Sequence, residues 1–122
     1  MIGYVTLGTN DLPRAAAYYD RLLAELGATR QWEIDRGIAW GPTPEAVSLV
    51  LMKPYDGQAA TVGNGVMVGL QAPSRELVAR VHARALALGG KDEGPVGLRG
   101  ESFFVGYFRD LDGNKLAVFC GG

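Results

Sequence analysis

YFRDLDGNKLAVFC, residues 107–120, is the stretch of this sequence that decides the fold. Two largely apolar runs flank the Asp-Gly-Asn at positions 112–114. An Asp-Gly pair between such runs is a strong signal for a β-hairpin, because both central turn positions favour a positive φ. In the second run, side chains from residue 115 onward alternate between the two faces of a strand, with Ala117 on one of them. The stretch therefore predicts a hairpin that closes the domain.

The chain before this hairpin contains the same pattern twice. A strand near Tyr4 leads to a helix that Asp11 caps, and 63 positions later a strand near Met67 leads to a helix that Ser74 caps. Glycines end both predicted helices, at position 27 and at positions 89–90.

Short strands complete each copy. We expect them at 32–34, 37–40 and 47–52 in the first copy and from residue 103 in the second, where residues 90–100 read as a glycine-rich loop with a weakly written strand. The sequence thus predicts an α+β fold in one domain, residues 1–122. Two βαβββ modules, about 1–56 and 64–122, would pair into a curved mixed sheet around a cavity.

Composition excludes several classes of function. The 122 residues are 48% hydrophobic and 20% charged, which fits one globular domain. Twelve basic and thirteen acidic residues are scattered, so nucleic-acid binding is not expected. We find no membrane-spanning run and no signal peptide, and we expect a cytoplasmic protein without membrane partners. A single histidine, His82, and a single cysteine, Cys120, exclude a two-imidazole metal site and an internal disulfide.

The sequence resembles the vicinal oxygen chelate superfamily, which includes glyoxalase I, extradiol dioxygenases, fosfomycin-resistance proteins and bleomycin-resistance proteins. The resemblance rests on GYVTL with NDL and YYD in residues 3–20, GNGVMV at 63–68 and YFRDLDGNKL at 107–116. It covers the whole chain and implies the paired-module fold described above. It also implies a homodimer.

Metal-using members of that family place ligands in the first strand, in the strand before the inter-module loop, at the opening of the second module and just after the Asp-Gly-Asn turn. The matching positions here are Tyr4, a residue near Leu49 or Leu51, Met67 and Ala117. None of them is a good ligand for a divalent metal. We therefore expect no metal site and no cofactor.

Several of these positions are candidates for binding a ligand instead. Tyr4 lines the cavity or packs under a helix, and Thr6 shares its face by strand parity. Tyr107 contacts the ligand or is a core aromatic. Trp40 is preferred to Trp32 as an apolar wall, with core filling as the alternative for both. The predicted ligand-binding set is Tyr4, Thr6, Trp40, Leu51, Met67, Tyr107 and Ala117.

Other chemistry-bearing residues have plainer interpretations. We expect a helix-packing or surface role for His82 and burial for Cys120. Asp110 and Asp112 are expected to be turn residues, since the spacing does not fit a calcium loop. The glycines of 63–65 and 94–100 are expected to be flexible rims of the cavity. Arg36 and Lys53 either reach an anionic ligand or are surface charges.

Three functions are compatible with these residues. The first is a metal-free small-molecule-binding protein that encloses an apolar or aromatic ligand between the modules. The alternative is a lyase, isomerase or dioxygenase-like enzyme of the same superfamily, with an atypical or metal-independent site in which Tyr4 or Tyr107 is the acid or base. The third is a non-catalytic partner whose shape serves dimerisation.

Overall fold

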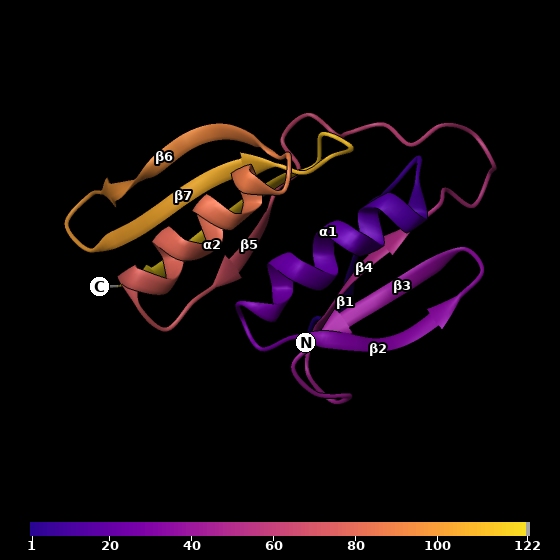
Figure 1. Cartoon of the computed structure of the whole chain (residues 1–122), viewed down its shortest axis with the longest axis horizontal. Coiled ribbons are helices and arrows are strands. Elements are labelled where there is room, and N and C mark those ends of the chain that lie inside the picture. Colours follow the sequence, from indigo (N-terminus) through magenta and orange to yellow (C-terminus); the bar gives the residue numbers. More distant parts are fainter. Residues whose placement is uncertain (122) are drawn as a thin grey trace. The chain divides into compact units, whose positions relative to one another are not determined.

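The computed structural model describes residues 1–121, which form two compact units, Met1–Val62 and a second unit that begins at Gly63 (Figure 1). The first unit runs β1 (Tyr4–Gly8), α1 (Leu12–Ala24), β2 (Thr29–Ile34), β3 (Gly37–Gly41) and β4 (Ser48–Met52). The second runs β5 (Val68–Gln71), α2 (Arg75–Ala87), β6 (Lys91–Arg99), β7 (Phe103–Arg109) and β8 (Lys115–Gly121). This order confirms the predicted α+β fold with two βαβββ units. No helix within residues 1–121 is long and apolar enough to cross a membrane.

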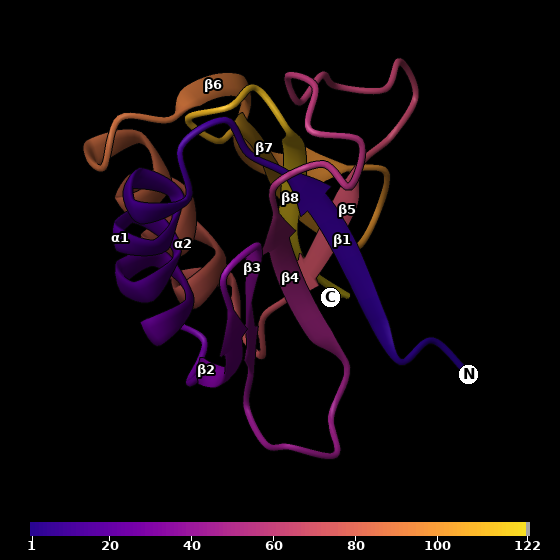
Figure 2. The same ribbon diagram turned by 90° about the vertical axis from the view of Figure 1, so that its right-hand side faces the viewer.

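The two units build their sheets in the same way. The strand order is β1-β4-β3-β2 in the first sheet and β5-β8-β7-β6 in the second. In each sheet the first strand pairs in parallel with the last, and the remaining pairs are antiparallel. One helix covers one face of each sheet. Figure 2 shows α1 alongside the sheet of the first unit.

Local sequence signals place both helices. The Asp11 carboxylate accepts a hydrogen bond from the Arg14 amide at 3.1 Å, and the Ser74 hydroxyl accepts one from the Leu77 amide at 3.2 Å. Each bond satisfies an amide that the first helical turn leaves without a partner. Both helices have 13 residues and start 63 positions apart, as the repeat predicts.

Each helix buries one face against its own sheet. The buried residues of α1 are Ala15, Ala16, Tyr18, Tyr19, Leu22 and Leu23, and those of α2 are Val78, Val81, His82 and Ala85. A fully buried leucine or valine side chain stabilises a fold by about 1.5–3 kcal/mol, so these two helix–sheet layers are the main source of stability of each unit.

The predicted glycine-rich loop at 90–100 is wrong for most of its length, because residues 91–99 form β6. This strand pairs with β7 through two irregularities, at Asp92/Gly94 and at Gly94/Gly97. A Cβ at Gly94 would lie 2.9 Å from Cδ2 of Tyr107, so glycine is required where the tyrosine ring crosses β6. Pairing with β7 overrides the low strand propensity of the glycines.

The closing hairpin is confirmed, although its turn differs from the expected one. β7 and β8 pair from Arg109 opposite Lys115 onward, which leaves a loop at 110–114. Gly113 is the one residue of this loop with a positive φ, 89°. Its amide donates a hydrogen bond to Asp110 O at 3.1 Å, and the Asp110 amide donates one to Asn114 O at 2.9 Å. This is the hydrogen-bond pattern of a type I turn followed by a G1 bulge. The Asp110 carboxylate accepts from the amides of Asp112 and Asn114, so these acids serve the turn.

A one-residue bulge in β2 decides which way that strand presents its side chains. Arg30 lies opposite Trp40, but Trp32 lies opposite Ala39, so Gln31 is an extra residue in the ladder. The Gln31 side chain donates to Gly41 O at 2.8 Å across the gap that the bulge opens. Beyond the bulge the alternation of faces is shifted by one residue.

Candidate functional site

The face of the first sheet that α1 covers contains two of the predicted ligand-binding residues, Trp40 and Leu51. Trp40 is 1% exposed, and its indole nitrogen donates to Asp20 of α1 at 2.9 Å. Its ring also contacts the ring of Tyr19. Leu51 lies opposite Ile38 and is fully buried. Both side chains belong to the core between helix and sheet, which for Trp40 is the alternative that the sequence left open.

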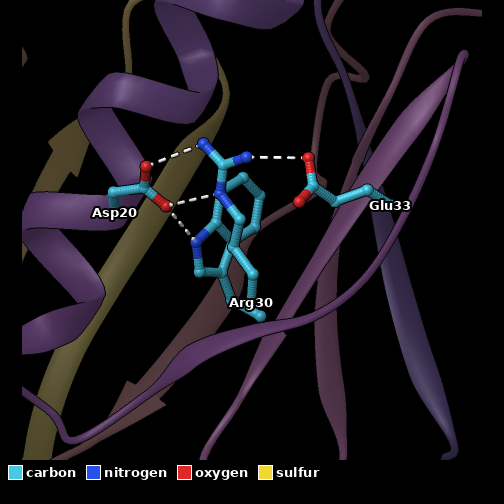
Figure 3. A network of polar contacts seen from close by, with 4 residues as sticks. Asp20, Arg30 and Glu33 are labelled. Atoms are coloured by element: carbon cyan, nitrogen blue, oxygen red, sulfur yellow. Dashed lines mark hydrogen bonds and ion pairs between the residues drawn. The ribbon is translucent and has the colours of Figure 1, made fainter.

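Figure 3 shows the polar contacts that fix this layer, with the Arg30 guanidinium between the carboxylates of Asp20 and Glu33. Arg30 binds Asp20 through two nitrogens, at 2.9 and 2.8 Å, and Glu33 through a third at 2.8 Å. The hydrogen bonds from Arg30 hold the pKa of Asp20 below its ordinary value, against the opposing effect of burial, and the bond from Trp40 lowers it further. The network joins α1 to β2 and β3.

Among the described residues of the first unit, no helix covers the other face of its sheet, which is called its helix-free face, and a row of four residues crosses it. Thr6 of β1 lies opposite Val50 of β4, which lies opposite Ala39 of β3, which lies opposite Trp32 of β2. Trp32 is 41% exposed. Tyr4, two residues before Thr6, lies on the same face and is 65% exposed. The indole that shares a face with Tyr4 and Thr6 is therefore Trp32, not Trp40.

The second sheet carries the equivalent row on its helix-free face. Gly69 of β5 lies opposite Ala117 of β8, Ala117 opposite Tyr107 of β7, and Tyr107 opposite Gly94 of β6. The Tyr107 ring lies over Gly94 of β6, the outer strand of the second sheet. The equivalent outer strand of the first sheet is β2, which carries Trp32. Each row thus has an aromatic ring at its outer end and small or aliphatic residues toward its first strand.

Two cations flank the Tyr107 ring. Lys115 Nζ lies 5.4 Å from the ring centroid and the guanidinium carbon of Arg99 lies 5.8 Å from it. Arg99 is held in place by a hydrogen bond to Pro95 O at 2.9 Å. Sequence reasoning missed Arg99, because β6 was expected to be a loop. A row of aromatic and aliphatic groups with cations at one end can bind a flat apolar group with a polar or negatively charged substituent.

The positions that the resemblance matches to metal ligands do not fit a divalent ion. Thr6 and Gly69 are 63 residues apart, and their partners are Val50 and Ala117, so the register puts Val50 at the position that the sequence assigned to Leu49 or Leu51. Leu49 and Leu51 lie on the α1 side of β4. Val50 and Ala117 have no donor atom, and the thioether of Met67, exposed just before β5, is too soft. Within residues 1–121, no three His, Cys, Asp or Glu side chains gather as a metal site would require.

The side chains of His82 and Cys120 lie on the α2-covered face of the second sheet, opposite the face that carries the Tyr107 ring. His82 belongs to the buried face of α2, and its Nε2 lies 3.0 Å from Tyr107 O and 3.3 Å from an Asp92 carboxylate oxygen. Cys120 is buried opposite Phe104, on the side of the sheet that α2 covers. These are the packing and burial roles that the sequence predicts for them.

The comparisons with known proteins agree with this architecture. The family model described as Glyoxalase/Bleomycin resistance protein/Dioxygenase superfamily matches residues 1–118. The solved structure of a glyoxalase/bleomycin resistance protein from Albidiferax ferrireducens is 33% identical, with a TM-score of 0.92, over 100% of this chain and 99% of the other. No curated protein sequence matches the chain.

Two solved structures of lower identity have the same fold. A genomically encoded fosfomycin resistance protein, FosX, from Listeria monocytogenes is 19% identical with a TM-score of 0.74 over 100% of this chain and 93% of the other. A lactoylglutathione lyase from Agrobacterium tumefaciens is 20% identical with a TM-score of 0.72 over 99% and 93%. The paired βαβββ topology and the family match over residues 1–118 together show that the chain belongs to the glyoxalase/bleomycin resistance protein/dioxygenase superfamily.

Proposed function

We propose that this chain is a small-molecule-binding protein of its superfamily that holds an apolar or aromatic ligand without a metal ion. The observation that supports this proposal is which residues make up the two equivalent rows. Thr6, Val50, Ala39 and Trp32 cross one sheet, and Gly69, Ala117, Tyr107 and Gly94 cross the other. They offer aromatic rings, methyl groups and hydroxyls, but no imidazole or carboxylate with which to hold a divalent ion.

The residues of the rows favour a ligand with a flat apolar part. Trp32 and Tyr107 supply rings that stack on or meet the edge of another ring, which stabilises a contact by about 0.5–1.5 kcal/mol beyond the area buried. Lys115 and Arg99, next to Tyr107, favour a polar or negatively charged substituent at that end of the ligand.

A ligand screen by thermal shift tests the proposal. A compound present at about a hundred times its Kd adds ~2.7 kcal/mol to the free energy of unfolding, which raises Tm measurably in a chain of this size. We expect hits among aromatic compounds, and we expect Tyr107→Ala and Trp32→Ala to lose most of the shift. Val47→Ala, which truncates an exposed apolar residue of the β3–β4 loop, is the control and should keep it.

The metal-free part of the proposal needs a separate measurement. Protein purified without chelators should contain far less than one equivalent of any transition metal, and added Zn²⁺, Ni²⁺ or Mn²⁺ should leave Tm unchanged. Stoichiometric metal would contradict the proposal. So would a broad panel of aromatic compounds of which none shifts Tm, or hits whose shift survives in both the Tyr107 and the Trp32 variant.

A further inference from the structure

A pocket lies wholly within the first unit, at the end of the sheet where β4 leaves it. Its volume is about 460 Å³, within the range of pockets that bind small molecules. It shares no residue with the two rows of the proposed ligand site. The lining residues are Thr9, Asn10, Arg36, Lys53, Pro54, Tyr55, Gly57, Gln58 and Ala59.

Hydrogen bonds hold the wall of this pocket in one conformation. The Lys53 amide donates to Arg36 O at 2.7 Å, which continues the pairing of β3 and β4 one residue past the end of β4. The side-chain amide of Asn10 donates to Ala60 O at 3.1 Å and accepts from the Ala60 amide at 2.7 Å. Asn10 therefore pairs with the loop as a neighbouring strand would. A loop fixed at both ends loses little further entropy when a ligand binds.

The charge of the pocket has one sign. Arg36 and Lys53 both line it, and none of the nine lining residues is acidic. The Arg36 guanidinium uses Nη1 to donate to Lys53 O at 3.3 Å, and within residues 1–121 its other nitrogens have no hydrogen-bond partner. Lys53 likewise forms no ion pair with any residue of the described chain. Two cations whose donors are available on one wall are suited to a carboxylate or a phosphate group.

An aromatic ring stands beside these cations. The guanidinium carbon of Arg36 lies 5.1 Å from the centroid of the Tyr55 ring. The ring is 91% exposed, which is a high value for a large aromatic side chain. Arg36 stacked on Tyr55 keeps both groups at the mouth of the pocket, and Pro54 extends the apolar surface next to the ring.

We infer that this pocket is a binding site for a small aromatic anion, with its phosphate or carboxylate group between Arg36 and Lys53 and its ring against Tyr55. The site is separate from the proposed ligand site on the helix-free faces. Two cations line this pocket itself, whereas in the rows cations lie only beside Tyr107. A phosphate or a carboxylate would both satisfy the donors, so the experiment compares the two.

Titration of the full chain with phenyl phosphate, followed by calorimetry and by NMR shifts, tests the site. We expect the amides of residues 53 and 55–60 to shift with phenyl phosphate and with benzoate, and the tighter of the two identifies the preferred anionic group. Arg36→Gln and Lys53→Gln should each weaken binding by about tenfold, since each removes a charge-assisted contact. Arg21→Gln on the exposed side of α1 and Lys91→Gln in β6 are the matched controls and should bind as the original chain does.

Lys53→Gln keeps the test decisive if Arg36→Gln fails to fold, because the Lys53 side chain is exposed and its replacement leaves the packing intact. Absence of binding by both phenyl phosphate and benzoate would overturn the inference. Equal weakening in the pocket variants and the controls would overturn it too, since that result would mean attraction to net charge alone. Inorganic phosphate should bind more weakly than phenyl phosphate, and equal binding of the two would refute the role given to Tyr55.

Discussion

His82 Nε2 lies 3.0 Å from the carbonyl oxygen of Tyr107. This contact links the backbone of β7 to α2 on one side of the second sheet, while the Tyr107 ring lies on the other side. The approach is possible because the neighbouring residue is Gly106. A Cβ there would lie 2.9 Å from Cδ2 of His82 and 2.8 Å from Cγ2 of Val96. The position of Tyr107 thus depends on a close contact between α2 and β7.

Gly106→Ala should therefore destabilise the chain. Adding a methyl group to a packed contact costs about 1–3 kcal/mol, because neither the imidazole nor Val96 can withdraw without leaving its own partners. Gly121→Ala is the control, since a Cβ at that position meets nothing within 4 Å. Urea unfolding followed by circular dichroism gives both free energies. A Gly106→Ala variant as stable as the Gly121→Ala variant would show that α2 can move away from β7 at little cost.

Variants of Asp20 separate its charge from its hydrogen bond to Trp40. Asp20→Asn removes the charge but keeps an oxygen that can accept from the indole. Because the Arg30 and Asp20 side chains are 34% and 41% exposed, we expect a loss of only about 0.5–1 kcal/mol at neutral pH. Asp20→Ala also leaves the buried indole without an acceptor, which costs ~1–3 kcal/mol more. Equal stability of the two variants would contradict this division.

The same pair predicts a dependence on pH. The pKa of Asp20 is lower in the folded chain than its ordinary value of 3.8, so the stabilisation is complete above that value and is lost as the pH falls through the folded pKa. The difference in unfolding free energy between the original chain and Asp20→Asn should shrink below about pH 4. Asp35→Asn, in an exposed turn, is the control. A difference that stays constant from pH 7 to pH 2 would refute the ion pair with Arg30.

The two tryptophans should behave in opposite ways. Trp40→Ala removes a buried ring and should cost about 3–5 kcal/mol, whereas Trp32→Ala should change stability by only ~1 kcal/mol or less. Because the chain has two tryptophans, Trp40→Phe leaves the fluorescence of Trp32 alone, and Trp32→Phe leaves that of Trp40. Acrylamide should quench Trp32 readily and Trp40 poorly. The reverse order would mean that the faces of β2 and β3 are assigned incorrectly.

Asn10→Asp should loosen the loop after β4. The carboxylate can still accept from the Ala60 amide, but it cannot donate to Ala60 O and repels that oxygen. We expect faster hydrogen exchange at residue 60 and faster chymotryptic cleavage after Tyr55. Asn64→Asp is the control for the added charge, since it lies outside the anchored part of the loop. Unchanged protection in Asn10→Asp would mean that other contacts hold the loop.

Much of the fold follows from signals that act over a few residues. Caps at Asp11 and Ser74 determine where the helices begin, and the repeat of 63 positions transfers one unit's order to the other. β6 could not be predicted, because its glycines have low strand propensity and only the Tyr107 ring of the neighbouring strand explains Gly94. Arg99, next to Tyr107, was missed for the same reason.

The candidate site was predicted only where strand parity is regular. Tyr4 and Thr6 share a face, and Tyr107 pairs with Ala117, as alternation along uninterrupted strands requires. The choice between Trp32 and Trp40 depended on a bulge that no residue type in β2 signals. The position near Leu49 or Leu51 was ambiguous for a related reason, since an error of one residue exchanges the two faces of a strand.

The bulge at Gln31 has a consequence for how this surface can change. Deleting that one residue would restore the regular ladder and leave both faces unchanged, because Arg30 would still lie opposite Trp40 and Trp32 opposite Ala39. If Gln31 instead took a regular place in the ladder without any deletion, one part of β2 would exchange its faces, so that either Arg30 would lose Asp20 or Trp32 would turn toward the helix. Among homologous chains, a β2 that lacks the bulge but keeps its arginine on the helix side and its aromatic residue on the other side should therefore be one residue shorter.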